Sequence, residues 1–287
     1  MGYKTYKKKQ NGIEIYVEDF DIKQTLECGQ CFRFFCEDNN NYFIIAHGRK
    51  LNISQKENKK FFLYPCTVQE FEDIWLNYFD LQTDYSRIKK TLAQKNKVLA
   101  KAINLYGGIR ILNQEKWETL ISFIISQNNR ISQIKKVIEN ISQMFGTQID
   151  NNYFAFPSHD QLLGATEEDL NNCRAGFRSK YILDAIKNTP DLKKLDNIST
   201  DSAKKILKKI KGVGDKVSDC VLLFAYNRHE VYPVDTWVKR VSQEIFFDKQ
   251  EVNLTQIREF AQEKFGDLAG YAQQYLFYYI RNQKNNF

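Results

Sequence analysis

The arrangement of hydrophobic residues changes in character early in the chain. Short runs of aromatic and β-branched residues come first, with polar, turn-forming stretches between them. Such runs are typical of the strands of an antiparallel sheet. They occupy residues 12–18 (GIEIYVE), 31–36 (CFRFFC), 42–47 (YFIIAH), 50–54 and 61–66 (FFLYPC). From Val68 onward hydrophobic residues recur at helical spacing instead, as in Phe71, Ile74, Trp75 and Tyr78.

This change of period predicts an α+β protein built of two parts. An N-terminal antiparallel β-sheet domain is expected over residues 1–80, and an all-helical domain over residues 81–287. No internal repeat or low-complexity linker separates them, so we expect the two parts to pack closely. Hydrophobic residues make up 43% of the chain and aromatic residues 14%, which excludes a disordered protein.

Residues 204–226 predict a helix–hairpin–helix. Apolar residues at helical spacing are interrupted by Gly212-Val213-Gly214 and then resume. Two glycines around one small residue allow a sharp turn, and they leave backbone N–H groups uncovered at the start of the second helix. Such a helix N-terminus suits a phosphate. By itself, a glycine-flanked turn is also typical of an ordinary helical hairpin.

Two chemically useful residues follow this turn. Lys216 lies two residues beyond it, and Asp235 comes nineteen residues later in a Pro-Val-Asp sequence. A neutral lysine amine is a nucleophile, and a nearby carboxylate can move protons or stabilise developing positive charge. With a phosphate cradle, the pair indicates covalent chemistry at a nucleic-acid sugar. From these residues alone the simpler interpretation is stronger, in which Lys216 is solvated and Asp235 caps a helix beginning near Thr236.

The motifs together resemble a known family. LKKIKGVGDKVSDC followed by YPVDTWV resembles the helix–hairpin–helix and Gly/Pro/Asp signature of base-excision DNA glycosylases, and its Lys-Val-x-Asp-Cys run is similar to the 8-oxoguanine DNA glycosylase/AP lyases. The resemblance extends from about residue 12 to residue 281. It implies that Lys216 attacks the sugar C1′ with help from Asp235. The implied activity is excision of 8-oxoguanine from duplex DNA through a lysine Schiff base, followed by strand cleavage by β-elimination.

The same resemblance implies a pocket for the flipped base. Gly29 precedes a predicted strand, where a turn glycine is the plain interpretation, but in the family this position accepts the extra N7–H of 8-oxoguanine with its carbonyl. Gln273 and Phe277 are an i, i+4 pair that by itself indicates core packing. The resemblance implies that Phe277 and Cys220 cover the two faces of the base and that Gln273 contacts its Watson–Crick edge.

Further DNA contacts are implied by the resemblance. Asn128 and Arg178 would reach the cytosine left unpaired, Phe177 would wedge into the base stack, and the backbone of Gly212 and Gly214 would hold a phosphate. Each has a plainer interpretation. Asn128 lies among amide side chains that are typical of helix capping. The pattern alone would place Phe177 in the core and Arg178 on the surface.

The sequence departs from the family at a few positions. Gln133 stands where the family usually has a second arginine that reads the cytosine, and glutamine lacks the charge and the forked donors. We therefore expect a weaker preference for cytosine opposite the lesion. Trp237 replaces a histidine near the phosphate, where an indole N–H could still donate. Ile280 replaces an acidic residue, so that contact is absent or replaced.

Charge and cysteine content limit the partners and cofactors. A net charge of +7 and a pI near 8.9 suit duplex DNA without proving it. No signal peptide or long apolar span is evident, so we expect a monomeric, cytoplasmic protein (nucleoid-associated if bacterial) with no membrane partner. The cysteines show no metal-site spacing, the C-x-x-C at 28–31 being interpreted as chance. We expect no required cofactor, metal site or iron–sulfur cluster, but at most a structural cation at the hairpin turn.

Two rival functions remain distinguishable from this one. A monofunctional glycosylase of the alkylation type would use Asp235 to activate water and would lack a lysine at position 216. A non-catalytic DNA-binding module would use the hairpin alone. It would need neither the pair of Lys216 and Asp235 nor the matching residues Gly29, Gln273 and Phe277.

Overall fold

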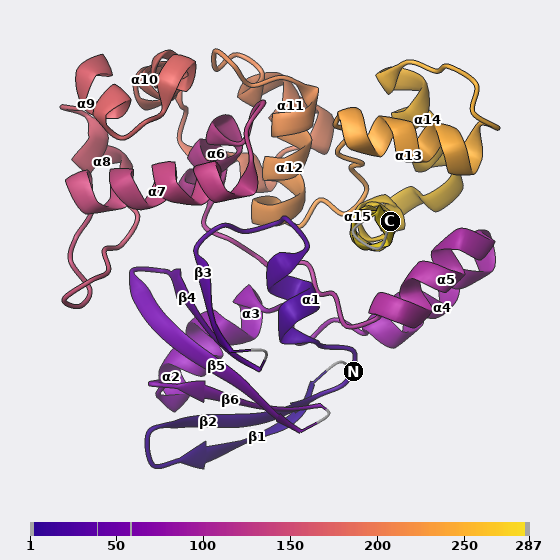
Figure 1. The fold of residues 1–287 in the computed structure, drawn as a ribbon, viewed down its shortest axis with the longest axis horizontal. Coiled ribbons are helices and arrows are strands. Elements are labelled where there is room, and N and C mark those ends of the chain that lie inside the picture. The colour runs from indigo at the N-terminus through magenta and orange to yellow at the C-terminus, as the bar shows by residue number, and fades with distance from the viewer. Residues whose placement is uncertain (1–2, 39, 58, 285–287) are drawn as a thin grey trace.

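A β-sheet layer and a helical layer make up the chain, which the computed structural model describes over residues 3–38, 40–57 and 59–284 (Figure 1). In these residues the sheet has six antiparallel strands in the order β1-β2-β6-β5-β4-β3. The strands are β1 (Tyr3–Lys9), β2 (Gly12–Val17), β3 (Phe34–Asp38), β4 (Asn41–Ala46), β5 (Arg49–Glu57) and β6 (Lys60–Tyr64).

One face of the sheet is buried, and the sequence pattern explains why. In β2 the residues Ile13, Ile15 and Val17 are fully buried, as the period of two requires for strands with one covered face. Antiparallel pairing places Ile13 opposite Leu63 of β6, so apolar side chains meet across the strands. The helical segment that follows the sheet adds its aromatic side chains to this core.

The rest of the chain is helical, as the period predicts. The first helical segment comprises α2 (Val68–Glu70), a π-helical stretch (Phe71–Trp75) and α3 (Leu76–Tyr78). The other helices are α4 (Tyr85–Lys95), α5 (Lys97–Tyr106), α6 (Lys116–Ile125), α7 (Ile131–Phe145), α8 (His159–Leu162), α9 (Glu167–Asn172), α10 (Ser179–Asn188), α11 (Thr200–Leu207), α12 (Asp215–Tyr226), α13 (Thr236–Phe246), α14 (Leu254–Phe265) and α15 (Ala269–Lys284). Short 3₁₀ turns lie at Gly176–Arg178, Leu192–Asn197 and Gly266–Leu268.

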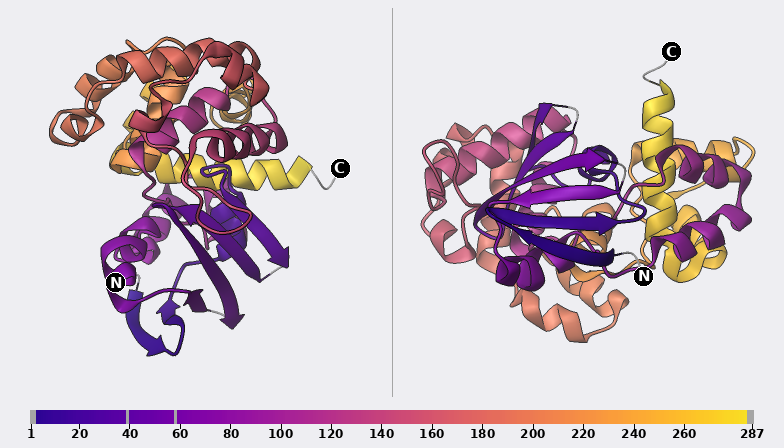
Figure 2. Two further views of the ribbon diagram at one scale, coloured as in Figure 1. Left: turned by 90° about the vertical axis from the view of Figure 1, so that its left-hand side faces the viewer. Right: turned by 90° about the horizontal axis from the view of Figure 1, so that it is seen from below.

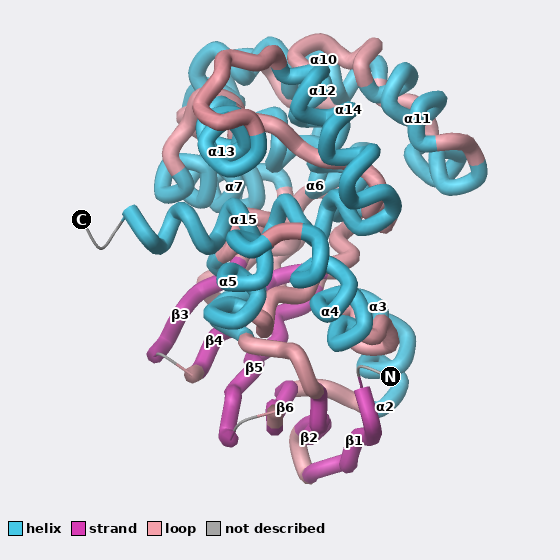
Figure 3. Tube along the Cα trace, turned by 90° about the vertical axis from the view of Figure 1, so that its right-hand side faces the viewer, coloured by secondary structure: helices cyan, strands magenta, loops and turns pink. Residues whose placement is uncertain are grey.

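The two layers meet along the last helix. Views from two opposite sides show α15 running between the sheet and the helices α6–α14 (Figures 2 and 3). Each layer has its own hydrophobic core, but the cores interlock in sequence. Cys28 and Phe32 come from the N-terminal region and pack in the helical core, whereas Leu112 packs in the core of the sheet. The α+β fold class predicted from the sequence is confirmed.

Two elements of the N-terminal region were not predicted. Strand β1 has the sequence YKTYKKK and lies at the edge of the sheet, paired with β2. Lysines are common on edge strands because they discourage pairing with other chains, and they hide the period of two. Helix α1 (Ile22–Glu27) is also additional, and the Asp21 side chain caps it by accepting from the Gln24 N–H at 2.8 Å. Across the described residues, every helix is too short or too polar to span a bilayer.

Candidate active site

The predicted hairpin is present between α11 and α12. Gly212 has φ +85°, and a Cβ there would come within 2.5 Å of the Tyr181 ring on α10. Both the backbone angle and the close approach therefore require glycine. Gly214 immediately precedes α12, and a Cβ there would meet nothing within 4 Å. The start of α12 is thus open to a group that approaches from outside.

Lys216 and Asp235 border the same cavity. Lys216 lies in the first turn of α12, and its Nζ donates to Ser126 Oγ at 3.3 Å and lies 4.9 Å from the centre of the Phe123 ring. Asp235 is indeed the N-cap of α13, because its Oδ1 accepts from the Val238 N–H at 2.7 Å. The capping role predicted by the simpler interpretation therefore coexists with a place at the cavity.

The cavity brings together residues from distant parts of the chain. It has a volume of about 50 Å³. Its lining includes all the residues predicted for chemistry and base recognition: Lys216, Asp235, Gly29, Cys220, Gln273 and Phe277. They come from the N-terminal region, from α12, from the segment before α13 and from α15. No local pattern could have joined them, so their meeting is a finding of the structure.

Gly29 is held in place by a residue that the sequence analysis missed. Gly29 has φ +87°, and a Cβ there would lie 3.3 Å from the Phe277 ring. The next residue, Gln30, is fully buried, and its Nε2 donates to the carbonyls of Thr25 (2.8 Å) and Arg110 (2.7 Å). Its Oε1 accepts from a backbone N–H in the segment before α6. A fully bonded, buried amide fixes this loop between the two layers.

Cys220 gives the cavity a neutral, polarisable wall. The side chain is buried and one helical turn beyond Lys216. Burial raises the pKa of the Cys220 thiol to about 11, although the neighbouring Lys216 ammonium acts in the opposite direction. The thiol therefore stays protonated near neutral pH, as suits a surface that packs against a base.

The base cavity is small in this structure. Ligand pockets usually measure about 300–1,000 Å³, well above the roughly 50 Å³ found here. The side chains of Gln273 and Gln274 are nearly buried and hydrogen-bonded to each other at 2.7 Å. A purine can enter only after such side chains move. Base binding therefore requires local rearrangement.

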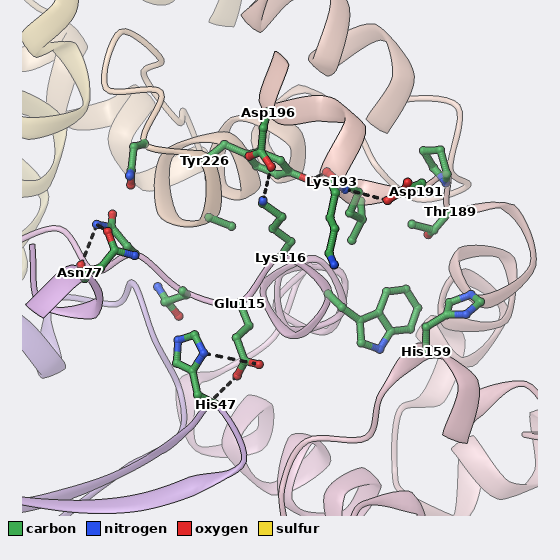
Figure 4. A pocket seen from close by; sticks show the side chains of 17 residues that line it. His47, Asn77, Glu115, Lys116, His159, Thr189, Asp191, Lys193, Asp196 and Tyr226 are labelled. Carbon is green, nitrogen blue, oxygen red and sulfur yellow. Dashed lines mark hydrogen bonds and ion pairs between the residues drawn. The ribbon is translucent and has the colours of Figure 1, made fainter. Parts of the chain in front are cut away.

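A much larger pocket, of about 770 Å³, lies at the start of α6 and the end of α12, which are the ends away from the base cavity (Figure 4). Lys116 at the start of α6 and Tyr226 at the end of α12 line it, and Lys116 pairs with Asp196 at 2.6 Å. Lys216 lies at the other end of α12 and borders the small cavity. The large pocket contains none of the predicted site residues. Cavity size alone would therefore misplace the site.

The residues predicted to face the unpaired base gather around the loop before α7. Asn128 is exposed with φ +48°. The Arg178 guanidinium is buried and donates to the carbonyls of Gln127 (2.5 and 2.8 Å) and Asn128 (2.8 Å). Arg178 therefore shapes the loop that presents Asn128. Phe177 beside it is 53% exposed, as a wedge must be.

Two of the positions that depart from the family lie near the starts of different helices. Gln133 is exposed in the first turn of α7. Trp237 is half-buried in the first turn of α13, two residues beyond Asp235, and does not line the base cavity.

A hairpin with a lysine in the first turn of its second helix, and a carboxylate lining the same small cavity, is the arrangement of a base-excision DNA glycosylase with lyase chemistry. Comparison with known families agrees. Residues 12–120 match the N-terminal domain of 8-oxoguanine DNA glycosylase, and residues 121–267 match the HhH-GPD superfamily of base excision DNA repair proteins. The chain belongs to the 8-oxoguanine DNA glycosylase/AP lyase family of that superfamily, which confirms the resemblance seen in the sequence.

The similarity to individual relatives covers most of the chain. An N-glycosylase/DNA lyase of Saccharomyces cerevisiae is 33% identical, over 96% of this chain and 86% of the yeast protein. A probable N-glycosylase/DNA lyase of Methanothermobacter thermautotrophicus is 30% identical, over 71% of this chain and 72% of its own length. The crystal structure of Clostridium acetobutylicum 8-oxoguanine glycosylase/lyase with duplex DNA containing cytosine opposite 8-oxoguanine superposes with a TM-score of 0.95. It is 40% identical, and the match covers all of both chains.

Proposed function

We propose that this enzyme removes 8-oxoguanine from duplex DNA and then cleaves the strand 3′ to the lesion. The observation that carries the proposal is the meeting of Lys216 and Asp235 with Gly29 and Phe277 at one cavity. A DNA-binding module without chemistry would not need this arrangement. A monofunctional glycosylase would have no use for the lysine.

The chemistry assigned to Lys216 has two stages. Its neutral amine attacks C1′, the bond from C1′ to the base breaks, and the base leaves with the electron pair and takes up a proton. The C1′–O4′ bond of the sugar ring then breaks as the nitrogen lone pair forms a C=N bond, and O4′ takes the electron pair and a proton, which gives a protonated Schiff base. Removal of a proton from C2′ then expels the 3′ phosphate. The carboxylate of Asp235 stabilises the positive charge that develops on the sugar during the first stage.

The resting position of the amine supports this role. Lys216 Nζ is held by the Ser126 hydroxyl and by the face of the Phe123 ring, the latter across 4.9 Å. These contacts keep the amine at the wall of the cavity. They are weak enough to be exchanged for contacts with the sugar when DNA enters.

Discrimination against guanine rests on Gly29. 8-Oxoguanine carries an N7–H that guanine lacks, and the Gly29 carbonyl would accept it. A hydrogen bond lost with a buried partner typically costs about 1–3 kcal/mol, which sets the scale of the discrimination. The buried Gln30 amide makes such precision possible because it fixes the adjacent backbone.

Selectivity for the opposite base should be weak. Asn128 and Arg178 can contact a cytosine, but the Arg178 guanidinium already donates hydrogen bonds to the backbone carbonyls of the loop before α7. Gln133 is exposed and uncharged where a second arginine is usual. A bidentate arginine contact typically gives about 1–3 kcal/mol of discrimination, and that contribution is missing.

The remaining requirements are simple. We propose that the enzyme acts as a monomer on duplex DNA in the cytoplasm, without a membrane partner or a required cofactor. Among the described residues no group of three or more His, Cys, Asp or Glu side chains could hold a metal. A structural cation at the hairpin turn would use backbone carbonyls, and the Asp184 carboxylate, which accepts from the Lys211 N–H at 2.7 Å, adds negative charge nearby.

Borohydride trapping tests the proposal directly. Wild-type protein incubated with an 8-oxoguanine duplex and borohydride should give a covalent protein–DNA product. Lys216→Gln should still bind the duplex but lose both base excision and trapping. Lys205→Gln, which removes an exposed charge on α11, serves as the control and should react like wild type. Comparable excision by Lys216→Gln would show that the nucleophile is misassigned.

A further inference from the structure

Helix α12 carries two stripes of functional side chains side by side. Lys216 and Cys220 form one stripe and line the base cavity. Asp215 and Asp219 form the other, each one residue before its counterpart, and therefore lie about 100° around the helix. The acidic stripe faces α11 and α14 instead of the cavity. The function described so far gives this second stripe no role.

Asp219 is gripped from two sides. Its side chain is only 2% exposed, with Oδ1 at 2.6 Å from Lys204 Nζ on α11. Its Oδ2 accepts from Arg258 Nε on α14 at 3.0 Å. Both carboxylate oxygens are therefore occupied by cations from different helices. Asp215 is 42% exposed and pairs mainly with Lys208, at 2.6 Å.

This buried charge is not explained by stability alone. Burial raises the pKa of Asp219, and the cations of Lys204 and Arg258 oppose that effect. Ion pairs in such surroundings often contribute no more stability than well-packed apolar residues would. What they do provide is a fixed geometry, because a carboxylate bound through both oxygens allows little rotation of the helix that carries it.

We propose that Asp219, held by Lys204 and Arg258, is a positioning residue that fixes the rotation of α12 and thereby aims Lys216 at the sugar. The inference rests on the proposed role of Lys216. At the outer radius of a helix, about 5–6 Å, a rotation of roughly 10° moves a side-chain tip by about 1 Å. A misplacement of about 1 Å can lower a reaction rate about a hundredfold.

The same contacts join the hairpin to the C-terminal helices. Lys204 belongs to α11, the first helix of the hairpin, and Arg258 belongs to α14, which packs against α15. Helix α15 in turn supplies Phe277 to the base cavity. A phosphate held at the hairpin turn, the amine of Lys216 and the far wall of the cavity are thus tied into one rigid unit.

Asp219→Asn tests the proposal, because asparagine keeps the shape and removes the charge. The variant should bind an 8-oxoguanine duplex with nearly the wild-type Kd. Its single-turnover rates of base excision and of borohydride trapping on an abasic duplex should fall about ten- to a hundredfold. Asp196→Asn is the matched control, because its exposed pair with Lys116, at 2.6 Å, involves neither Lys204 nor Arg258 and should matter less than about fivefold. All rates are measured well below each variant's melting temperature.

A purely structural role makes a different prediction. Asp219→Asn would then melt at a lower temperature but react at the wild-type rate while folded, which would overturn the proposal. If Asp219→Asn does not fold, Arg258→Lys replaces it, since lysine keeps the charge and loses the Nε contact. Arg258→Lys should slow the chemistry without weakening binding, and an unaltered rate would likewise overturn the proposal. Failure of the wild-type protein to react with either substrate would instead overturn the proposed function.

Discussion

Replacing Gly29 by alanine would separate base recognition from sugar chemistry. Gly29 has φ +87°, a backbone conformation that costs a residue with a side chain about 1–2 kcal/mol. The new Cβ would lie 3.3 Å from the Phe277 ring and 3.7 Å from Arg281 Nη1, so the ring must shift by a few tenths of an ångström. The added methyl group would crowd the wall of the base cavity, which Gly29 and Phe277 both line.

The two activities should respond differently. Excision of 8-oxoguanine needs the base in the cavity and the Gly29 carbonyl in register, a contact worth about 1–3 kcal/mol or roughly five- to 150-fold in rate. Cleavage at an abasic site needs no base, so its rate should remain close to that of wild type. Single-turnover rates on 8-oxoguanine and abasic duplexes measure both, with melting curves to follow stability.

Gly48→Ala provides a matched control. Gly48 has φ +66°, but a Cβ there meets nothing within 4 Å and the residue lies in the turn before β5. It should reproduce the backbone strain without affecting either activity. Excision by Gly29→Ala at the wild-type rate, or an equal loss of both activities, would refute the assignment of Gly29 to base recognition.

Three further predictions concern other residues. Asp235→Asn keeps the N-cap of α13 but should slow single-turnover excision by several kcal/mol of barrier, whereas a cap alone predicts an unaltered rate. Gln133→Arg should raise the preference for cytosine roughly tenfold or more when excision is compared opposite all four bases; a wild-type preference already above about a hundredfold would contradict this reasoning. Burial raises the pKa of Glu118 from its usual 4.5 to about 8, although Arg33 opposes the shift. The folded state therefore loses stability as the pH rises from about 4.5 to about 8, and Glu118→Gln should flatten the melting temperature over that range; a slope equal to that of wild type would exclude this group.

The sequence predicted the secondary-structure elements better than it predicted how they pack against one another. Periodicity identified the sheet and the helices because the faces of β2 and of the helices are buried along their whole length. It missed β1, whose lysines obscure the pattern at an edge. The boundary near residue 80 stays a prediction, and the pattern did not show that Cys28 packs in the helical core and Leu112 in the core of the sheet. Local patterns report which face of an element is buried, but not which other element covers it.

The candidate site shows the same limit. The family resemblance suggested roles for Gly29 and Phe277, yet only the fold brings these residues within contact across the two layers. Gln30 was overlooked because a buried amide has no sequence signature apart from its glycine neighbour. Arg178 was expected to face DNA, and its bonds to the loop before α7 could not be read from spacing. Such contacts are long-range and depend on the assembled core.

The small base cavity has a consequence for how the enzyme surveys DNA. At about 50 Å³ the cavity would admit an extruded base only after side chains move, so intact guanine and damaged guanine would face the same initial barrier. Affinity for an extruded base is reduced by the fraction of molecules whose compartment is open. A rare, brief opening would reject most of the undamaged genome before any hydrogen bond is tested. The enzyme would then reject most extruded bases quickly, and the slow step would be entry of a base into the cavity.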